Sequence, residues 1–136
     1  MATIPFLAAV DAELSFRKIL MRYTEALQSQ VMQTAACNSR HALDQRLGRW
    51  LLMAHDRAEG DNLPLTQEFI AAMLGVHRPT VTNAARSLQC AGLIKYSGDG
   101  QITILDRRGL EAMACECHGV VQRLSLIHIS EPTRPY

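Results

Sequence analysis

One stretch of the sequence decides the fold: residues 66–92, which read TQEFIAAMLGVHRPTVTNAARSLQCAG. Thr66 is a favourable N-cap for a short helix over residues 67–74. Gly75 favours the left-handed conformation that ends such a helix. Because a second helical pattern begins only three residues later, the stretch predicts a helix-turn-helix.

The second helix of the pair is predicted to begin within one residue of Arg78. Pro79 suits the first turn of a helix, where its missing N–H leaves no hydrogen bond unmade. One face is apolar at spacings i, i+4 and i+7 and is expected to be buried: Val81, Ala85 and Leu88. The opposite face carries Pro79, Thr82, Asn83 and Arg86. We therefore expect a helix that is anchored on one side and presents mostly polar groups on the other.

After the second helix the hydrophobic pattern changes from helical spacing to alternation, which predicts strands. Residues 93–96 and 101–105 are expected to form short strands around the hairpin turn Ser97-Gly98-Asp99-Gly100. A further short strand is predicted over residues 63–65. A helix-turn-helix followed by a hairpin is a winged helix, so the predicted fold class is mainly α with a three-helix core and a β-hairpin wing.

Two more helices are predicted around this motif. One runs from an N-cap at Asn38 or Ser39 to about His55, with Arg49 on its solvent side. Its buried face is expected to comprise Leu43, Leu47, Trp50, Leu51 and Ala54. A last helix is predicted over about residues 107–118.

The N-terminal segment predicts a single helix over residues 11–34, capped by Asp11. An apolar seam recurs along it at spacings of 3 and 4: Phe16, Leu20, Tyr23, Leu27 and Val31. Such a seam fits either a helix packed on its own domain or a helix paired with a second copy of the chain. The narrow seam and its polar flanks favour the second interpretation, a dimerisation helix.

The composition bounds the class of protein. The 136 residues are 48% apolar and 20% charged, which suits one globular domain with an appendage. No apolar run is long enough to span a bilayer, and residues 1–10 lack the basic start of a secretory signal, so we expect a cytoplasmic location. The four cysteines, Cys37, Cys90, Cys115 and Cys117, are therefore expected to be reduced thiols.

The charges are unevenly distributed, although the net charge is only +1. No carboxylate occurs between Glu68 and Asp99, whereas Arg78, Arg86 and Lys95 fall inside that interval. A local basic surface of this kind can face a polyanion even on a neutral protein.

The second helix of a helix-turn-helix enters the major groove of DNA, where arginine can pair with guanine and asparagine with adenine. We therefore expect double-stranded DNA as a partner. The residues expected to read bases are Arg78, Pro79, Thr82 and Asn83. Those expected to contact the DNA backbone are Thr66, His77, Thr80, Arg86 and Lys95.

Three segments also resemble a known family: residues 66–71 (TQEFIA), 75–82 (GVHRPTVT) and 91–94 (AGLI). Together with Cys37-Asn38 and residues 46–52 upstream, they resemble the DNA-binding domain of the Crp/Fnr family of bacterial transcription regulators. The resemblance covers about residues 11–121. It implies a homodimer, paired along the N-terminal helix, that binds a two-fold symmetric operator to control transcription, with RNA polymerase as a further partner.

The chain departs from the family pattern in two ways. The family's recognition helix commonly carries an arginine, a glutamate directly after it, and a second arginine five residues after the first. Arg78 keeps the first position, but Pro79 replaces the glutamate and Asn83 the second arginine, so the operator preference of the best-known members does not carry over. Members also normally begin with a β-roll effector domain, and no strand-rich segment precedes Asp11, so we expect a fragment that lacks the sensor.

The predicted division of the chain follows from these elements. Residues 1–36 are interpreted as the dimerisation helix, a remnant of the effector domain, and residues 37–121 as the winged helix. Residues 122–136 are expected to be a disordered tail. From about Leu124 this tail resembles the translation of a transposase-type sequencing adapter.

Other functions are weighed against this one. The run Cys115-Glu116-Cys117-His118 is metal-like, but C-x-C on one helix directs the two thiols about 200° apart, so buried thiols are expected there and no metal or cofactor. No nucleophile-elbow, P-loop or dinucleotide motif occurs, so we expect no catalytic residue and no enzyme. A protein-binding winged helix and a gene fragment without DNA binding remain as alternatives. The polar face of the second helix argues against the former.

Overall fold

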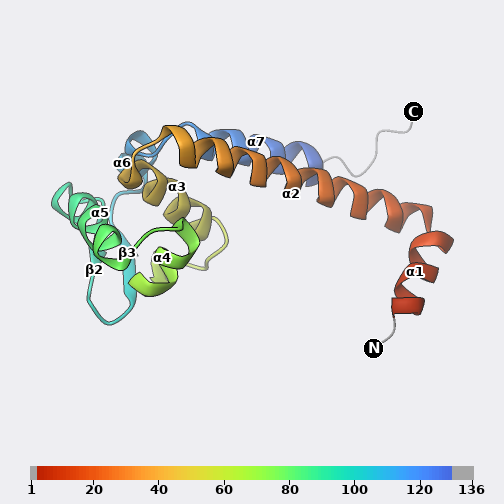
Figure 1. Ribbon diagram of the computed structural model, residues 1–136, viewed down its shortest axis with the longest axis horizontal. Helices are drawn as coiled ribbons and strands as arrows, with labels where there is room; N and C mark the ends of the chain where they lie inside the picture. The colour runs from red at the N-terminus through yellow and green to blue at the C-terminus, as the bar shows by residue number, and fades with distance from the viewer. Residues whose placement is uncertain (1–2, 130–136) are drawn as a thin grey trace. The chain divides into compact units, whose positions relative to one another are not determined.

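The structure, a computed structural model, describes residues 3–129 (Figure 1). Its helices are α1 (Thr3–Ala12), α2 (Leu14–Arg40), α3 (Leu43–His55), α4 (Gln67–Leu74), α5 (Arg78–Cys90), α6 (Arg107–Met113) and α7 (Cys117–Ile129). Its strands are β1 (Asn62–Pro64), β2 (Ile94–Tyr96) and β3 (Gln101–Ile104). The chain falls into two compact units. The first, here called the winged-helix unit, is residues 36–118, and the described part of the second is residues 3–35 and 119–129.

The first helix of the helix-turn-helix begins and ends as predicted. The Thr66 hydroxyl accepts a hydrogen bond from the Phe69 N–H at 3.2 Å and so caps α4. Gly75 ends α4 with φ 66° and ψ 40°, a left-handed conformation that glycine adopts without steric strain. The side chain of Arg46 in α3 donates to the Leu74 carbonyl at 2.7 Å, which ties the end of α4 to α3. The sharp turn from α4 into α5 is therefore fixed by the left-handed conformation of Gly75 and by the hydrogen bond from Arg46 of α3.

The second helix, α5, is anchored by the residues expected to be buried. It begins at Arg78 with Pro79 in its first turn. The exposed fractions of Val81, Ala85 and Leu88 are 0%, 4% and 0%. This burial confirms the predicted orientation of α5.

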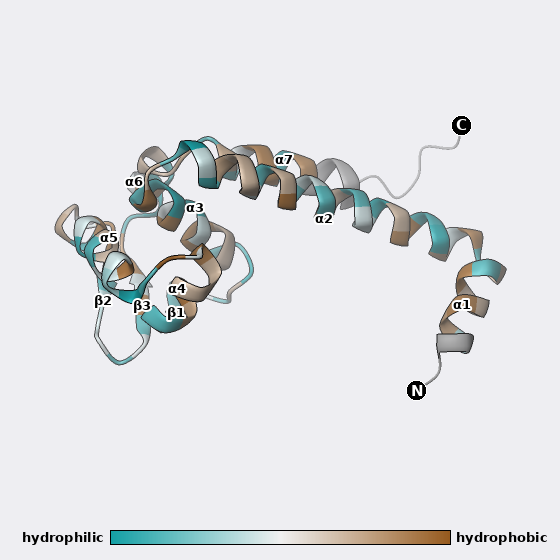
Figure 2. Cartoon of the chain, in the orientation of Figure 1, coloured by the Kyte–Doolittle hydropathy of each residue, from teal (hydrophilic) through white to brown (hydrophobic). Residues whose placement is uncertain are grey.

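The wing forms as an antiparallel sheet of order β1-β3-β2, whose strands are labelled in Figure 2. In the predicted hairpin, Ile94 of β2 pairs with Ile104 of β3. The separate strand predicted upstream is found at 62–64 and adds to the other edge of β3, where Leu63 pairs with Ile102. Among the described residues, 3–129, these are the only strands. The fold of the winged-helix unit is therefore a winged helix-turn-helix.

The core of this unit lies between α3, α4, α5, α6 and the sheet. Its largest fully buried apolar side chains are Leu47, Leu51, Leu52, Ile70, Val81, Leu88, Ile94, Ile102 and Leu110. Trp50 of α3 also packs edge-on against Phe69 of α4, with ring centroids 6.0 Å apart. Burying each large side chain contributes roughly 1.5–3 kcal/mol, so this core, and not helix propensity, holds the short helices in place.

A polar network holds α6 against the end of α3. Arg107 donates to Asp56 at 2.5 Å and to Glu111 at 2.9 Å. His118 lies 3.0 Å from the other Asp56 oxygen. Burial raises the pKa of Asp56, but the hydrogen bonds from His118 and Arg107 outweigh it, and the pKa lies below its usual value. The charged form of Asp56 is therefore favoured in the folded protein.

The N-terminal helix differs from the prediction. Instead of one helix over 11–34, α1 ends at Ala12 and α2 runs from Leu14 to Arg40. Asp11 lies inside α1 and is not a cap. No glycine or proline follows residue 34 in this stretch, and Cys37 is fully buried, so the helix continues until it meets the winged-helix unit.

The start of α3 and one side chain of the winged-helix unit were also predicted wrongly. Asn38 and Ser39 lie in the last turn of α2, and α3 is capped at Ala42, whose N–H donates to the Gln45 side chain at 3.2 Å. Arg49 is only 3% exposed, not on the solvent side, because α3 is covered on several sides.

The last predicted helix is interrupted. α6 ends at Met113 and α7 begins at Cys117, so Cys115 and Cys117 do not share one helix. α7 then continues to Ile129, and the predicted disordered tail is wrong for residues 122–129. Residues 130–136 lie outside the described residues.

α2 exposes much apolar surface along its length, where Figure 2 shows hydrophobic and hydrophilic residues alternating. Of the predicted seam, Phe16 and Leu20 are half-buried, whereas Tyr23, Leu27 and Val31 are exposed. Even so, no helix in the described part of the chain combines the length and the apolarity needed to cross a membrane.

Candidate nucleic-acid interface

The exposed face of α5 carries the residues predicted to read bases. Arg78, Pro79 and Asn83 are exposed, on the side of α5 opposite its buried anchor. No acidic residue lies in the first turn of α5. Because the N-terminus of a helix carries a partial positive charge, this end of α5 favours an anionic partner.

Thr82, the remaining predicted base-reading residue, is half-buried and engaged within the protein. Its hydroxyl lies 2.9 Å from the Gln67 side-chain oxygen and 3.1 Å from the Arg78 carbonyl, and donates to one of them at a time. The first contact joins α5 to the start of α4. Thr82 therefore positions the two helices relative to each other, and its hydroxyl already has partners before any ligand binds.

A shallow hollow lies between α5 and the wing, and several of its lining side chains are polar. Thr82, Arg86 and Gln89 of α5 line it together with Gln67 of α4 and Tyr96 of β2. Sequence reasoning missed Gln67, Gln89 and Tyr96. Gln89 could have been found, because it follows Arg86 by three residues on the same helical face. The other two reach the hollow only through the fold.

The five predicted backbone contacts are all exposed: Thr66, His77, Thr80, Arg86 and Lys95. Thr66 accepts one hydrogen bond as the cap of α4, which leaves its hydroxyl proton for an external acceptor. His77 is the N-cap residue of α5, but its side chain makes no capping hydrogen bond. Lys95 lies in β2, which forms an edge of the sheet.

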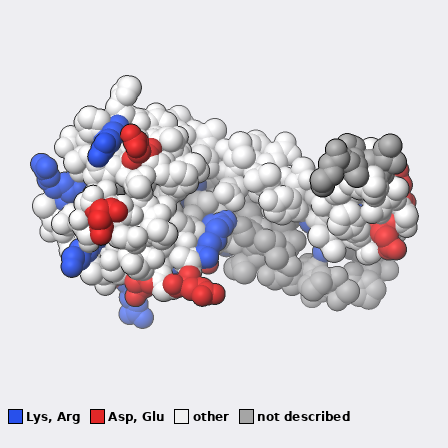
Figure 3. Space-filling model, turned by 90° about the horizontal axis from the view of Figure 1, so that it is seen from below, with Lys and Arg blue, Asp and Glu red and all other residues white. Residues whose placement is uncertain are grey.

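The electrostatics of the face are set by a few cations that form no ion pair in the described part of the chain. Within residues 3–129, none of Arg78, Arg86 and Lys95 forms an ion pair. Figure 3 shows basic and acidic residues interspersed over the side of the molecule in view, without a continuous basic surface there. The charges available to a polyanion are therefore few and local, consistent with the net charge of +1.

Comparison with known proteins also identifies a helix-turn-helix domain in the part of the chain that contains α4 and α5. A family described as the Crp-like helix-turn-helix domain matches residues 45–113. No protein with a curated description matches the chain significantly.

One similar solved structure is a protein from Eubacterium rectale whose description assigns it to the Crp/Fnr family of transcriptional regulators. It is 36% identical to this chain, with a TM-score of 0.59, and the match covers 67% of this chain and 44% of that protein's chain. FixK2 from Bradyrhizobium japonicum is 22% identical, with a TM-score of 0.72, covering 79% of this chain and 56% of its own. A CooA mutant from Carboxydothermus hydrogenoformans is 20% identical, with a TM-score of 0.71, and the match covers 81% of this chain and 54% of the CooA chain.

The chain thus spans about half the length of these solved relatives. The family match covers half of the sequence and includes α4, the turn, α5 and the wing. The chain therefore belongs to the Crp/Fnr family and carries its Crp-like helix-turn-helix domain.

Proposed function

We propose that the chain is the DNA-binding part of a transcription regulator and binds a specific double-stranded sequence as a homodimer. The observation that carries this proposal is the exposed face of α5. It offers a guanidinium and an amide beside a helix N-terminus, and no carboxylate occurs between Glu68 and Asp99.

Base readout is assigned to the first two turns of α5. Arg78 can donate two parallel hydrogen bonds to a guanine edge, and Asn83 can pair with an adenine edge. Pro79 and the methyl group of Thr82 offer apolar contacts, for example to a thymine methyl. Because Thr82 is hydrogen-bonded to Gln67, its methyl group is held in one orientation.

Positioning on the DNA backbone is assigned to exposed groups around this helix. They are Thr66, His77, Thr80, Arg86 and Lys95. Lys95 lies on the wing and Thr66 at the start of α4, so phosphates on both sides of the groove would be engaged. These contacts add affinity that is independent of sequence and falls with salt.

Dimerisation is assigned to α2. The exposed fractions of Tyr23, Leu27 and Val31 are 61%, 46% and 60%. Large side chains at this spacing match the a and d positions of a helix pair, and a partner helix would bury them. Two copies related by a two-fold axis would present two α5 helices to a symmetric operator. Contact with RNA polymerase stays a prediction from the family resemblance.

Selection of binding sites from random duplexes, with the purified chain, tests this proposal. We expect a palindromic enriched site, with binding that weakens as salt rises. Sedimentation of the free protein should show a dimer. Recovery of no enriched sequence would contradict specific DNA binding, and an enriched site without two-fold symmetry would contradict the dimer.

A further inference from the structure

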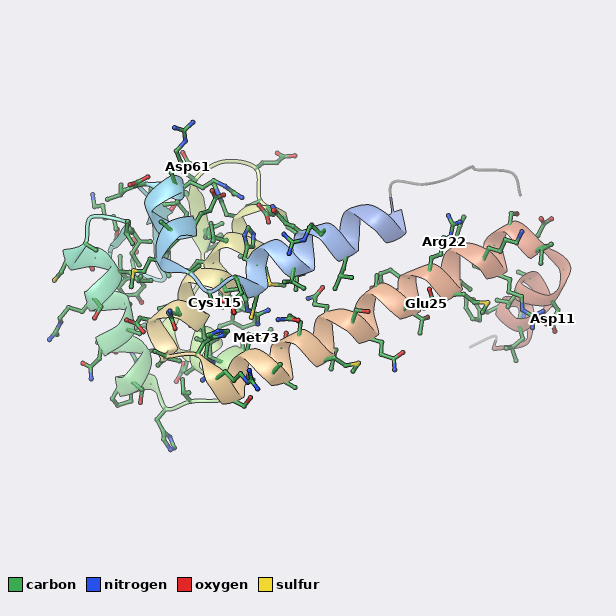
Figure 4. The ribbon with its side chains drawn as sticks, turned by 90° about the horizontal axis from the view of Figure 1, so that it is seen from above. Asp11, Arg22, Glu25, Asp61, Met73 and Cys115 are labelled. Carbon is green, nitrogen blue, oxygen red and sulfur yellow. The ribbon has the colours of Figure 1, made fainter. Side chains whose placement is uncertain are left out.

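A cluster of possible metal ligands lies in the winged-helix unit, and none of its residues belongs to α5. The thiols of Cys37, Cys115 and Cys117 and a ring nitrogen of His41 all lie within 4.8 Å of one another. The three cysteines are at most 4% exposed. Cys37 comes from the end of α2, and His41 follows that helix. Cys115, labelled in Figure 4, lies in the break between α6 and α7, and Cys117 begins α7.

The distances suit a single tetrahedral ion. Zinc bonds thiolate sulfur at about 2.3 Å and imidazole nitrogen at about 2.0–2.1 Å, which places ligand atoms roughly 3.5–3.8 Å apart. The Cys37 and Cys115 sulfurs are 3.5 Å apart, and the Cys117 sulfur lies 3.6 Å from His41 Nδ1. These two pairs form opposite edges of a tetrahedron. The remaining pairs lie within 4.8 Å, so each needs to shorten by at most about 1.3 Å to close around zinc.

The imidazole of His41 is oriented as a metal ligand would be. Its Nδ1 faces the Cys117 sulfur, while its Nε2 lies 3.4 Å from a Glu116 carboxylate oxygen. A histidine that binds a metal through one nitrogen usually donates its other N–H to a carboxylate or carbonyl, which fixes the ring. Glu116 stands between the two cysteines in sequence, so the same short segment supplies two ligands and the group that orients a third.

The charges around the cluster also fit. Three thiolates, one neutral imidazole and Zn²⁺ sum to one negative charge. The guanidinium of Arg49 is 3% exposed, and its positive charge acts on the Cys37 sulfur. A buried cation is stabilised by a nearby anion. The anionic zinc centre would place a negative charge near that guanidinium.

Two other metal and redox centres fit the cluster less well. An iron–sulfur cluster distributes its protein ligands over two or more irons, which requires ligands spread around the cluster and not gathered about one point. A disulfide between Cys37 and Cys115 would join only two of the four groups. It would not explain why the Glu116 carboxylate lies beside the imidazole of His41.

We propose that Cys37, His41, Cys115 and Cys117 hold one structural Zn²⁺ ion that fastens the first residues of the winged-helix unit to its last. All four coordination positions are filled by the protein, as in structural and not catalytic zinc sites. The ligands are separated by up to 80 residues in sequence. The ion would therefore link the two ends of the unit and stabilise its fold on binding.

The test begins with the full chain, expressed in zinc-supplemented medium and purified under reducing conditions. We expect one equivalent of zinc per chain by elemental analysis. Exchange for Co²⁺ should give the strong visible absorption of a tetrahedral site, with near-ultraviolet charge-transfer bands from thiolate to cobalt. Removing the metal with a chelator should lower the melting temperature, and adding zinc should restore it.

Variants assign the ligands. Cys37→Ser and Cys115→Ser should each lose the stoichiometric metal, whereas Cys90→Ser, at an exposed cysteine outside the cluster, should keep it. Glu116→Gln should weaken metal affinity by about 10-fold, with Glu59→Gln as the control at an exposed carboxylate. An unchanged affinity would remove Glu116 from the site.

The wild-type measurement decides the proposal even if a cysteine variant fails to fold. A reduced, folded chain that takes up neither zinc nor cobalt stoichiometrically would overturn it. So would equal metal content in the Cys37→Ser and Cys90→Ser variants. A Cys37–Cys115 disulfide found by mass spectrometry in a metal-free chain would replace the zinc site by a redox pair.

Discussion

Replacing Arg78 by alanine separates base readout from general attraction to DNA. Arg78 is exposed, and within residues 3–129 its guanidinium forms no ion pair. The free energy of unfolding should therefore change by less than about 0.5 kcal/mol. A loss of affinity would then report on the DNA complex alone, because the free protein is unaltered.

The expected magnitude follows from the contact that the geometry allows. A bidentate pair between arginine and guanine contributes about 1–3 kcal/mol of discrimination, or roughly 5–150-fold in Kd. Arg78→Lys keeps the charge but cannot donate two parallel hydrogen bonds from a planar group. The lysine variant should therefore keep the salt dependence of binding and still lose most of the discrimination.

The assay is a fluorescence anisotropy titration with three duplexes: the selected operator, the operator with one base pair changed, and a random sequence. The Arg78→Ala variant should bind the operator more weakly than the wild-type protein does. It should also no longer distinguish the operator from the changed operator, when the changed base pair is the one that Arg78 contacts. Affinity for the random duplex should fall much less. An equal loss on the operator and the random duplex would refute base readout, since it would show that Arg78 contacts only phosphate.

Four further predictions follow from particular residues. Lys95→Ala should weaken binding to all sequences alike and reduce the slope of log Kd against log salt by about one unit, and an unchanged slope would remove Lys95 from the backbone contacts. Leu27→Glu places a charge in the proposed helix pair and should give a monomer by sedimentation, with weaker operator binding; a stable dimer would place the interface elsewhere. Leu88→Ala should lower the free energy of unfolding by about 2–5 kcal/mol in urea titrations, since Leu88 is fully buried, and a loss below about 1 kcal/mol would mean that the core repacks. The pKa of Asp56 is lowered in the folded state, so its stabilisation is full above the ordinary value of 3.8 and is lost as the pH falls through the lower folded value. Asp56→Asn should therefore flatten the dependence of the urea midpoint on pH in that acid range, and parallel curves for both proteins would contradict this.

The helix-turn-helix could be predicted because its determinants are local. A cap at Thr66, a left-handed glycine at 75 and one apolar face on α5 are each encoded within a few residues. The hairpin is equally local, because its turn sequence and alternation are adjacent. These elements therefore agree between sequence and structure.

The features that were missed depend on contacts distant in sequence. The break between α6 and α7 occurs where Cys115 meets Cys37, 78 residues earlier, and no local glycine or proline marks it. Arg49 was assigned to solvent from periodicity, but α3 is covered on several faces. The bond between Thr82 and Gln67 likewise joins two helices, so single-helix periodicity could not separate a base-reading hydroxyl from a positioning one.

The middle place of β3 in the sheet has a consequence for how this domain can diversify. β1 holds β3 from one side, while β2 and the tip at residues 97–100 lie toward the other. Gly98 and Gly100 both adopt positive φ, and residues 97–99 are exposed. Insertions at that tip would lengthen the wing without shifting the pairing of β3 with β1. The sequence of the wing tip could thus change, by evolution or by design, and alter which part of a DNA duplex the wing reaches, while the fold of the domain stays the same.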